Sequence, residues 1–228
     1  MLPLIAAAVI LFALCATGRY SVQIGFIERP LVLGLIWGGC TGDLTTPVLL
    51  GLCCELFWLD LFPIGSYLPP MPAFSLLLLL PLVQHFGWNT PQMLTLPLFL
   101  LLPLAYLPTL LEKRLRLLAV TEHIRLVEAS ERQESLGSLP GRAVGKNLLW
   151  TGLSMAVLYM LCLAAAFSFF TVAGRSLVQA GEGINLGWGQ LLGICALGAF
   201  LGLRLPRAYL AFFTCICILA TLVVAFVA

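Results

Sequence analysis

The chain has 228 residues, of which 61% are hydrophobic and only 10% are charged, with a formal net charge of +2. A soluble domain carries about 25% charged residues, so this composition indicates an all-α integral membrane protein, a polytopic helical bundle that forms one transport domain over residues 1–228. The sequence has no basic stripe and no zinc-ligand spacing, which excludes nucleic acid as a partner.

The N-terminal half contains four apolar runs that are each shorter than the roughly 20 residues needed to cross a bilayer. They cover Leu2–Thr17, Leu31–Cys40, Val48–Leu61 and Phe74–Val83. The first run lacks the basic residues that begin a signal peptide, so we expect a retained membrane segment. Short runs broken by Gly and Pro predict interrupted or re-entrant helices, and such segments point to the binding site of a transporter.

The C-terminal half is more regular. Residues Met93–Leu111 predict a full span, and "QHFGWNTPQ" before it predicts a turn-rich connector. Residues 112–147 then contain seven of the 12 basic residues and five of the ten acids. We expect this stretch to be a charged loop with an amphipathic helix, on the cytoplasmic side by the positive-inside rule. Further spans are predicted at Leu148–Val172, Trp188–Leu203 and Ala208–Ala228.

Small residues recur throughout the apolar segments. Eight cysteines lie there without any C-x-x-C pair, so we expect packing residues rather than disulfides or metal ligands. Gly34, Gly38 and Gly42 follow one another at four-residue spacing, which lets helices approach closely in lipid. This spacing fits internal helix packing, and it also fits a subunit interface.

Three acids interrupt the apolar stretch from residue 38 to residue 65: Asp43, Glu55 and Asp60. A carboxylate at the centre of a membrane helix costs about 2.5–3.5 kcal/mol on insertion scales, so an intramembrane acid is first a functional-site hypothesis. Asp43 lies in "GDLTTP", a predicted break that would face a polar cavity. Asp60 fits an interfacial or turn-capping position.

Glu55 lies in the middle of its apolar run. No basic residue occurs between Arg29 and Lys113, so no neighbour in sequence neutralises it. It must pair across the fold, be protonated, or bind a ligand in a site. Of the three acids, Glu55 is therefore the hardest to explain as a purely structural residue.

A carboxylate in a dry cavity suits two kinds of chemistry. It accepts hydrogen bonds from sugar hydroxyls, or it carries a proton or a sodium ion. Trp37 and Trp58 are candidates for stacking on a sugar, and both also fit interfacial anchoring. The sequence contains no nucleophile elbow, phosphate-binding Gly loop or metal-ligand cluster. We therefore expect no catalytic residues, no metal and no cofactor.

The motif order in this region is specific. "RPLV" precedes "GD", which is followed by "T-x-x-x-x-G-x-x-x-E-L" and "PIG". Over about 45 residues this order resembles the membrane subunit IIC of the mannose/fructose/sorbose family of bacterial sugar phosphotransferase systems. The resemblance implies a sugar-translocating permease subunit that carries no phosphoryl group itself. It also implies that sugar is bound by Asp43, Thr46, Glu55 and Gly65.

The resemblance further implies a hetero-oligomer in the bacterial inner membrane, in contact with lipid. Its partners would be a second membrane subunit, IID, and soluble IIA and IIB phosphocarrier proteins, of which IIB phosphorylates the sugar, a hexose or a related compound. The chain departs from the family pattern at three positions, which are Pro47 and Asp60, where Gly is usual, and Met71, where Asp is usual. A proton- or sodium-coupled secondary transporter and a diverged, non-transporting membrane subunit are the alternatives.

Overall fold

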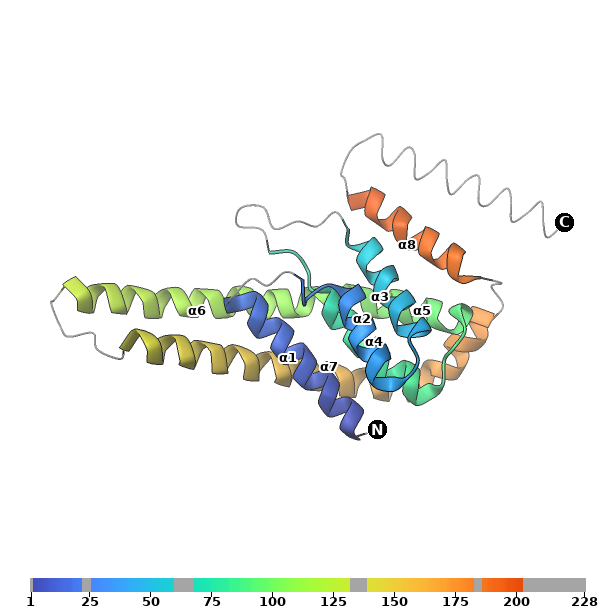
Figure 1. Ribbon diagram of the computed structural model, residues 1–228, viewed down its shortest axis with the longest axis horizontal. Coiled ribbons are helices and arrows are strands. Elements are labelled where there is room, and N and C mark those ends of the chain that lie inside the picture. Colours follow the sequence, from blue (N-terminus) through green and yellow to red (C-terminus); the bar gives the residue numbers. More distant parts are fainter. Residues whose placement is uncertain (1, 22–25, 60–67, 132–138, 183–185, 203–228) are drawn as a thin grey trace.

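The structure is a computed structural model that describes residues 2–21, 26–59, 68–131, 139–182 and 186–202, and every element within these ranges is helical (Figure 1). The elements are α1 (Leu2–Ser21), α2 (Pro30–Thr41), α3 (Thr45–Phe57), α4 (Pro72–Phe86), α5 (Pro91–Leu101), the short 3-10 helix η1 (Leu102–Ala105), α6 (Tyr106–Glu131), α7 (Leu139–Glu182) and α8 (Trp188–Gly202). The predicted all-α membrane fold is confirmed, and the predicted span Ala208–Ala228 lies outside the described residues.

Among the described residues, two continuous helical stretches are long and apolar enough to cross a membrane. Pro91–Thr121 runs through α5, η1 and the start of α6, and Val144–Gly174 lies within α7. Each has 31 residues, or about 46 Å of helix, against a hydrocarbon core of about 30 Å. They contain the predicted spans Met93–Leu111 and Leu148–Val172.

Helices α2 and α3 form a tight antiparallel hairpin (Figure 1). With 12 and 13 residues they are about 18–20 Å long, which is shorter than the hydrocarbon core of about 30 Å. A Cβ at Gly34 would lie 2.4 Å from the carbonyl oxygen of Pro47, and a Cβ at Gly51 would lie 2.6 Å from that of Pro30. The glycines therefore serve internal helix packing at these positions, because only a missing Cβ permits this approach.

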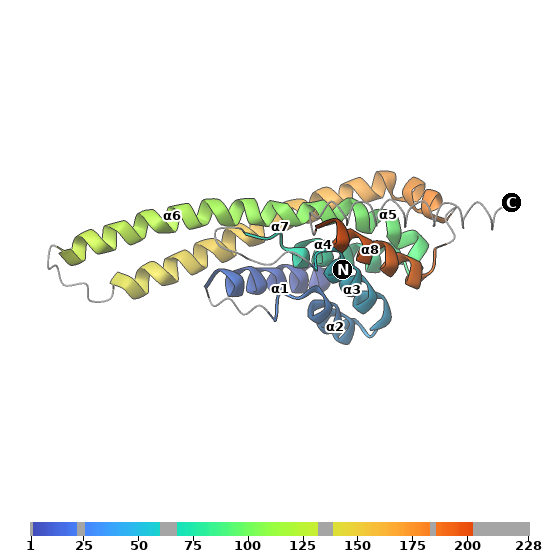
Figure 2. The same ribbon diagram turned by 90° about the horizontal axis from the view of Figure 1, so that it is seen from above.

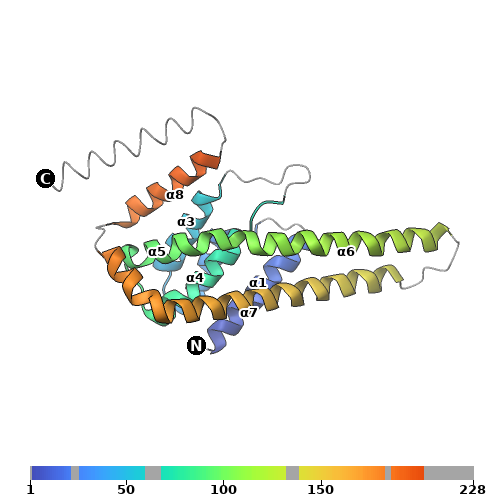
Figure 3. The same cartoon turned by 180° about the vertical axis from the view of Figure 1, so that it is seen from behind.

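Helix α4 is the centre of the bundle. Its residues from 73 to 83 are all buried, and it contacts α1, α2, α3, α5 and α7. Figures 2 and 3 show it enclosed between the hairpin and α1 on one side and the long helices α6 and α7 on the other. The N-terminal end of α4 is joined to η1, because the Met71 N–H donates to the Ala105 carbonyl and the Ser75 hydroxyl donates to the Leu102 carbonyl.

The charged stretch 112–147 is largely helical rather than a loop. Helix α6 continues to Glu131 and α7 begins at Leu139, and together they extend as a long hairpin beyond the other helices (Figures 1 and 3). The first residue of this stretch is buried, because the side chain of Glu112 is only 2% exposed. Glu112 is buried because α6 starts six residues earlier and packs against the bundle.

Candidate functional site

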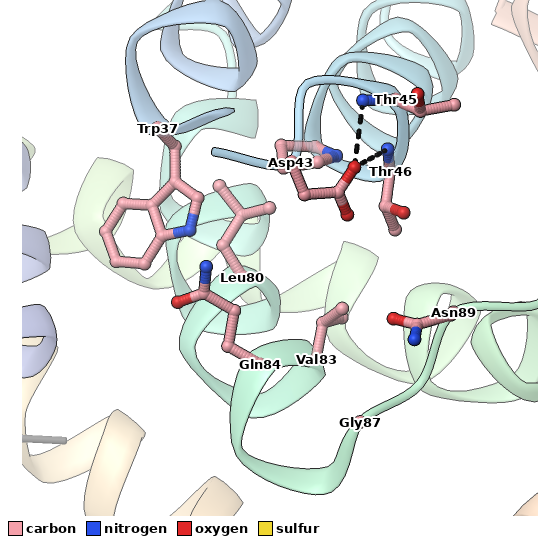
Figure 4. Close-up of a pocket in the computed structure, with 10 residues that line it drawn as sticks. Trp37, Asp43, Thr45, Thr46, Leu80, Val83, Gln84, Gly87 and Asn89 are labelled. Carbon is pink, nitrogen blue, oxygen red and sulfur yellow. Dashed lines mark hydrogen bonds between the residues drawn. The ribbon is translucent and has the colours of Figure 1, made fainter. Parts of the chain in front are cut away.

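A cavity of about 660 Å³ lies between the tip of the α2–α3 hairpin and the C-terminal end of α4 (Figure 4). Ligand pockets commonly measure roughly 300–1,000 Å³, so its size suits a small solute. We call it the hairpin pocket. Its polar and aromatic lining residues are Trp37, Asp43, Thr45, Thr46, Gln84 and Asn89.

The hairpin tip builds one wall of the hairpin pocket. Helix α2 ends at Gly42, whose φ of +82° is a left-handed conformation that glycine adopts readily. The next residue, Asp43, turns its carboxylate back to the start of α3, where Oδ1 accepts hydrogen bonds from the N–H groups of Thr45 (3.1 Å) and Thr46 (3.5 Å) (Figure 4). This anion satisfies two free donors and complements the helix dipole. Asp43 stays exposed on the pocket side.

The end of α4 builds the opposite wall. Gly87, with φ +70°, ends the helix by donating its N–H to the Val83 carbonyl, and Gln84 lies in the last turn. Within the described part of the chain, the buried Oε1 of Gln84 and Nε1 of Trp37 have no hydrogen-bond partner. Figure 4 shows the indole nitrogen directed to the side where the Gln84 amide lies. A hydroxyl group can both donate and accept a hydrogen bond, so it has the chemistry to pair with either atom.

Glu55 lies at the other end of α3. Its Oε1 accepts a hydrogen bond from Arg29 Nη1 at 3.2 Å, and its Oε2 accepts one from the Leu31 N–H at 3.2 Å. Glu55 is therefore paired across the fold, which is one of the three possibilities considered for it. Its carboxylate also accepts a hydrogen bond from a backbone N–H in the first turn of α2 that has no partner within the helix. Twelve residues of chain separate it from Asp43, which is about 18 Å along a helix.

The remaining predicted site residues are divided between two places. Trp37 and Thr46 join Asp43 in the hairpin pocket. Trp58 follows α3 near Glu55, where its ring packs edge-on against Phe57 and Tyr106, with centroids 5.1 and 5.5 Å apart. Like that of Trp37, its buried Nε1 has no partner among the described residues. Asp60 and Gly65 lie outside the described residues.

Two residues at which the chain departs from the family pattern have clear structural roles. Pro47 is the third residue of α3, where its missing N–H is one of the donors that a helix start leaves free. Met71 is 1% exposed and packs in the core before α4. Both substitutions are therefore compatible with the fold around the hairpin pocket.

A second polar centre lies at the far end of α1, near the start of α6. Arg19 pairs with Glu28 (Nη1 to Oε2, 3.6 Å) and with Glu112 (Nε to Oε2, 3.3 Å), and Glu112 also pairs with Arg116 (2.6 Å). Arg19 further donates from Nη2 to the Pro69 carbonyl at 2.7 Å. We call these four charged residues the ionic cluster. They join α1, the α1–α2 connector, the segment before α4, and α6.

Sequence reasoning missed Gln84 and Asn89 as site candidates, because "QHFGWNTPQ" was interpreted as a connector. Helix α4 continues through Gln84 to Phe86, so the glutamine lies in the last turn of a mainly apolar helix. An amide that directly follows ten apolar or small residues was the available signal. The ionic cluster gave no such signal, since its four members are spread over 98 positions of the sequence.

The fold is that of a helical membrane protein with a polar pocket at the tip of a hairpin of two short apolar helices, and short, interrupted apolar segments of this kind are typical of transporters. The family model of the sorbose-specific IIC component of phosphotransferase systems matches residues 3–201. The chain belongs to this family, and it is therefore a membrane component, IIC, of a sugar phosphotransferase system. The predicted resemblance is confirmed.

Two solved structures share the fold. One, described as a membrane protein, superposes with a TM-score of 0.64 at 18% sequence identity, and the match covers 100% of this chain and 93% of the other. The second is the mannose transporter ManYZ, determined by cryo-electron microscopy in complex with microcin E492. It has a TM-score of 0.59 at 18% identity, and the match covers 99% of this chain and 94% of that one. No curated protein sequence matches the chain.

Proposed function

We propose that this IIC component binds a sugar in the hairpin pocket and passes it through the inner membrane to a IIB protein, which phosphorylates it. The observation that carries the proposal is a pair of buried atoms that have no hydrogen-bond partner among the described residues, Gln84 Oε1 and Trp37 Nε1, in side chains that line the pocket beside the exposed Asp43 carboxylate. A donor, an acceptor and an anion in one cavity suit a ligand rich in hydroxyl groups. Leaving such groups unpaired is costly, so they reject solutes that lack the matching hydroxyls.

Within this proposal, Asp43 has two tasks. Its Oδ1 organises the first turn of α3, while its second carboxylate oxygen is available to a sugar hydroxyl. Thr46 adds a further hydroxyl to the lining and Trp37 an aromatic face. Glu55 is assigned to the opposite end of the hairpin, where it fixes the start of α2 through Leu31.

The partners follow from the family. A IID membrane subunit completes the transporter, and soluble IIA and IIB proteins deliver phosphate from phosphoenolpyruvate on the cytoplasmic side, where the α6–α7 hairpin would lie. Support comes from the mannose transporter that shares the fold and from the basic residues concentrated in residues 112–147.

The competing function is transport coupled to a proton or sodium gradient through Asp43 and Glu55. A single coupling site needs both carboxylates within a few ångströms of one ion, whereas these lie at opposite ends of α3 and Glu55 is already paired with Arg29. The geometry therefore favours group translocation.

The test uses everted membrane vesicles that contain this chain and its IID subunit, supplied with the soluble phosphotransferase proteins. We expect sugar to leave the vesicles as its phosphate only when phosphoenolpyruvate is added. Gln84→Leu should weaken sugar binding at least about tenfold, because it removes the amide acceptor with only a modest change in the size of the side chain. Gln92→Leu, on α5 and outside the pocket lining, is the matched control. Transport driven by an ion gradient alone would overturn the proposal, and so would unchanged binding by Gln84→Leu.

A further inference from the structure

Helix α4 contains a proline about two turns after its start. The backbone carbonyl that this proline leaves without a helical hydrogen bond accepts a hydrogen bond from another helix. Pro81 has no N–H, so the Leu77 carbonyl, four residues earlier, loses its usual partner within the helix. The hydroxyl of Tyr159, on α7, donates to this same carbonyl at 2.7 Å. A bond from outside thus replaces the missing helical bond at the point where a helix bends most easily.

The Tyr159 ring is held firmly in place. It is fully buried, stacks on Phe12 of α1 with ring centroids 5.2 Å apart, and meets Phe74 of α4 edge-on at 5.9 Å. Phe12 and Phe74 also contact one another, with centroids 5.1 Å apart. Three helices therefore fix the position of the hydroxyl, which in turn fixes the carbonyl it binds.

The part of α4 beyond Pro81 is the wall of the hairpin pocket. Val83 and Gln84 lie within three residues of the proline, and the helix ends at Phe86, with Gly87 as its C-terminal cap. Two turns further along α7, Phe167 packs against His85 with centroids 5.3 Å apart. Helix α7 thus holds α4 at the proline and again just beyond Gln84.

We propose that Tyr159 is a positioning residue for the hairpin pocket, whose hydroxyl bond to the carbonyl freed by Pro81 sets the direction in which the end of α4 presents Gln84 to the sugar. This rests on the proposed function, since it needs the hairpin pocket to be the sugar site. A small displacement is enough to matter, because polar ligand contacts tolerate errors of well under 1 Å. Tyr159 itself does not line the pocket.

The test is a double-mutant cycle measured as sugar affinity of the purified complex with its IID subunit. Tyr159→Phe keeps the ring and removes only the hydroxyl, and we expect it to weaken sugar binding about tenfold. In Pro81→Ala the residue at 81 regains an N–H that can bond to the Leu77 carbonyl. In that background, Tyr159→Phe should change affinity less than twofold. Tyr106→Phe, which also removes one phenolic hydroxyl, is the matched control and should leave affinity unchanged.

If Pro81→Ala does not fold, a second double-mutant cycle, with Tyr159→Phe and Gln84→Leu, tests the same proposal. If Tyr159 acts through Gln84, then Tyr159→Phe should add nothing to the effect of Gln84→Leu. Additive effects in either cycle, or an unchanged affinity in Tyr159→Phe, would overturn the positioning role. If instead the hairpin pocket were not the sugar site, Gln84→Leu alone would bind sugar normally, and this result distinguishes failure of the proposed function from failure of the positioning role.

Discussion

The hairpin pocket and the ionic cluster both contain acids within an apolar bundle, but the two regions treat them differently. In the ionic cluster, Glu112 is 2% exposed and is paired with two arginines. In the hairpin pocket, Asp43 is exposed to the cavity, and the only hydrogen bonds described for it come from backbone N–H groups. The ionic cluster pairs its charges within the fold, although Glu112 Oε2 is held by its ion pair with Arg19 and by no hydrogen bond among the described residues. The hairpin pocket has an exposed carboxylate and no ion pair among the described residues.

How an acid is paired therefore distinguishes a structural acid from a candidate binding residue, whereas its mere presence in an apolar segment does not. A buried charge with complete pairing adds rigidity and leaves nothing for a ligand to bind. A buried polar atom without a hydrogen-bond partner costs free energy, and a ligand in a neighbouring cavity recovers that free energy if it forms the missing hydrogen bond. By this criterion Glu55, which has both oxygens in hydrogen bonds, belongs with the ionic cluster.

The largest effect is expected when the ionic cluster loses its central cation. Arg19→Met removes the pairs to Glu28 and Glu112 and the hydrogen bond to the Pro69 carbonyl. Breaking a buried pair by removing one partner costs about 3–5 kcal/mol, so we expect a strong loss of thermal stability and of folded protein. Size-exclusion chromatography after heating measures this loss.

Arg114→Gln is the control for this experiment. It removes a charge in the same region of α6 from an exposed side chain, and exposed charges contribute little to stability. If Arg19→Met were as stable as Arg114→Gln, the ionic cluster would not be a structural centre, and the contrast with the hairpin pocket would fail.

A smaller loss is expected from closing the space between α2 and α3. Gly34→Ala places a methyl group 2.4 Å from a backbone oxygen, which must separate the hairpin, and forced packing of this kind costs about 1–3 kcal/mol. Gly39→Ala is the matched control on the same helix, with no atom within 4 Å of the added group. We expect Gly34→Ala to lower both thermal stability and sugar uptake. Equal behaviour of the two variants would show that the close approach does not hold the hairpin.

The two ends of α3 provide the most direct comparison. Asp43→Asn should leave stability within a few tenths of a kcal/mol, because Asn caps helices as well as Asp does, but sugar affinity should fall about tenfold. Glu55→Gln should cost less than about 1 kcal/mol, since Arg29 is half exposed, and should leave sugar affinity unchanged. Binding and unfolding measurements on both variants test this pattern. A greater loss of affinity in Glu55→Gln would move the sugar path to the other end of the hairpin.

Much of the helical layout was predictable because local signals mark the helix ends. Pro30, Pro72 and Pro91 each begin a helix, where a missing N–H costs nothing, and Gly42 and Gly87 end one with positive φ. The short apolar runs between these signals correctly predicted an interrupted N-terminal half. These features depend on neighbouring residues alone.

Pairing across the fold could not be predicted in the same way. That Glu55 pairs with Arg29 depends on the register of the hairpin, which the contact between Gly34 and Pro47 sets. The burial of Glu112 depends on the placement of α6, whose Glu112 pairs with Arg19 of α1. The predicted site residues included Asp43, Thr46 and Trp37, which line the hairpin pocket, and also Glu55 and Trp58, which lie at the other end of α3. Gln84 joins the lining only through the position of α4.

The smallest effect is a pH dependence that belongs to the ionic cluster. Glu28, in the connector between α1 and α2, has its pKa raised to about 7 by burial, with Arg19 opposing the rise and Glu112 adding to it. The folded protein therefore binds this proton more tightly than the unfolded chain does, and the resulting stability is present below about pH 4.5 and is lost as the pH rises through 7. We expect Glu28→Gln to flatten thermal stability between these pH values relative to the unmodified protein. No residue of the hairpin pocket is expected to produce this pH dependence. If Glu28→Gln left the pH profile of thermal stability unaltered, the pH dependence would belong to a group other than Glu28.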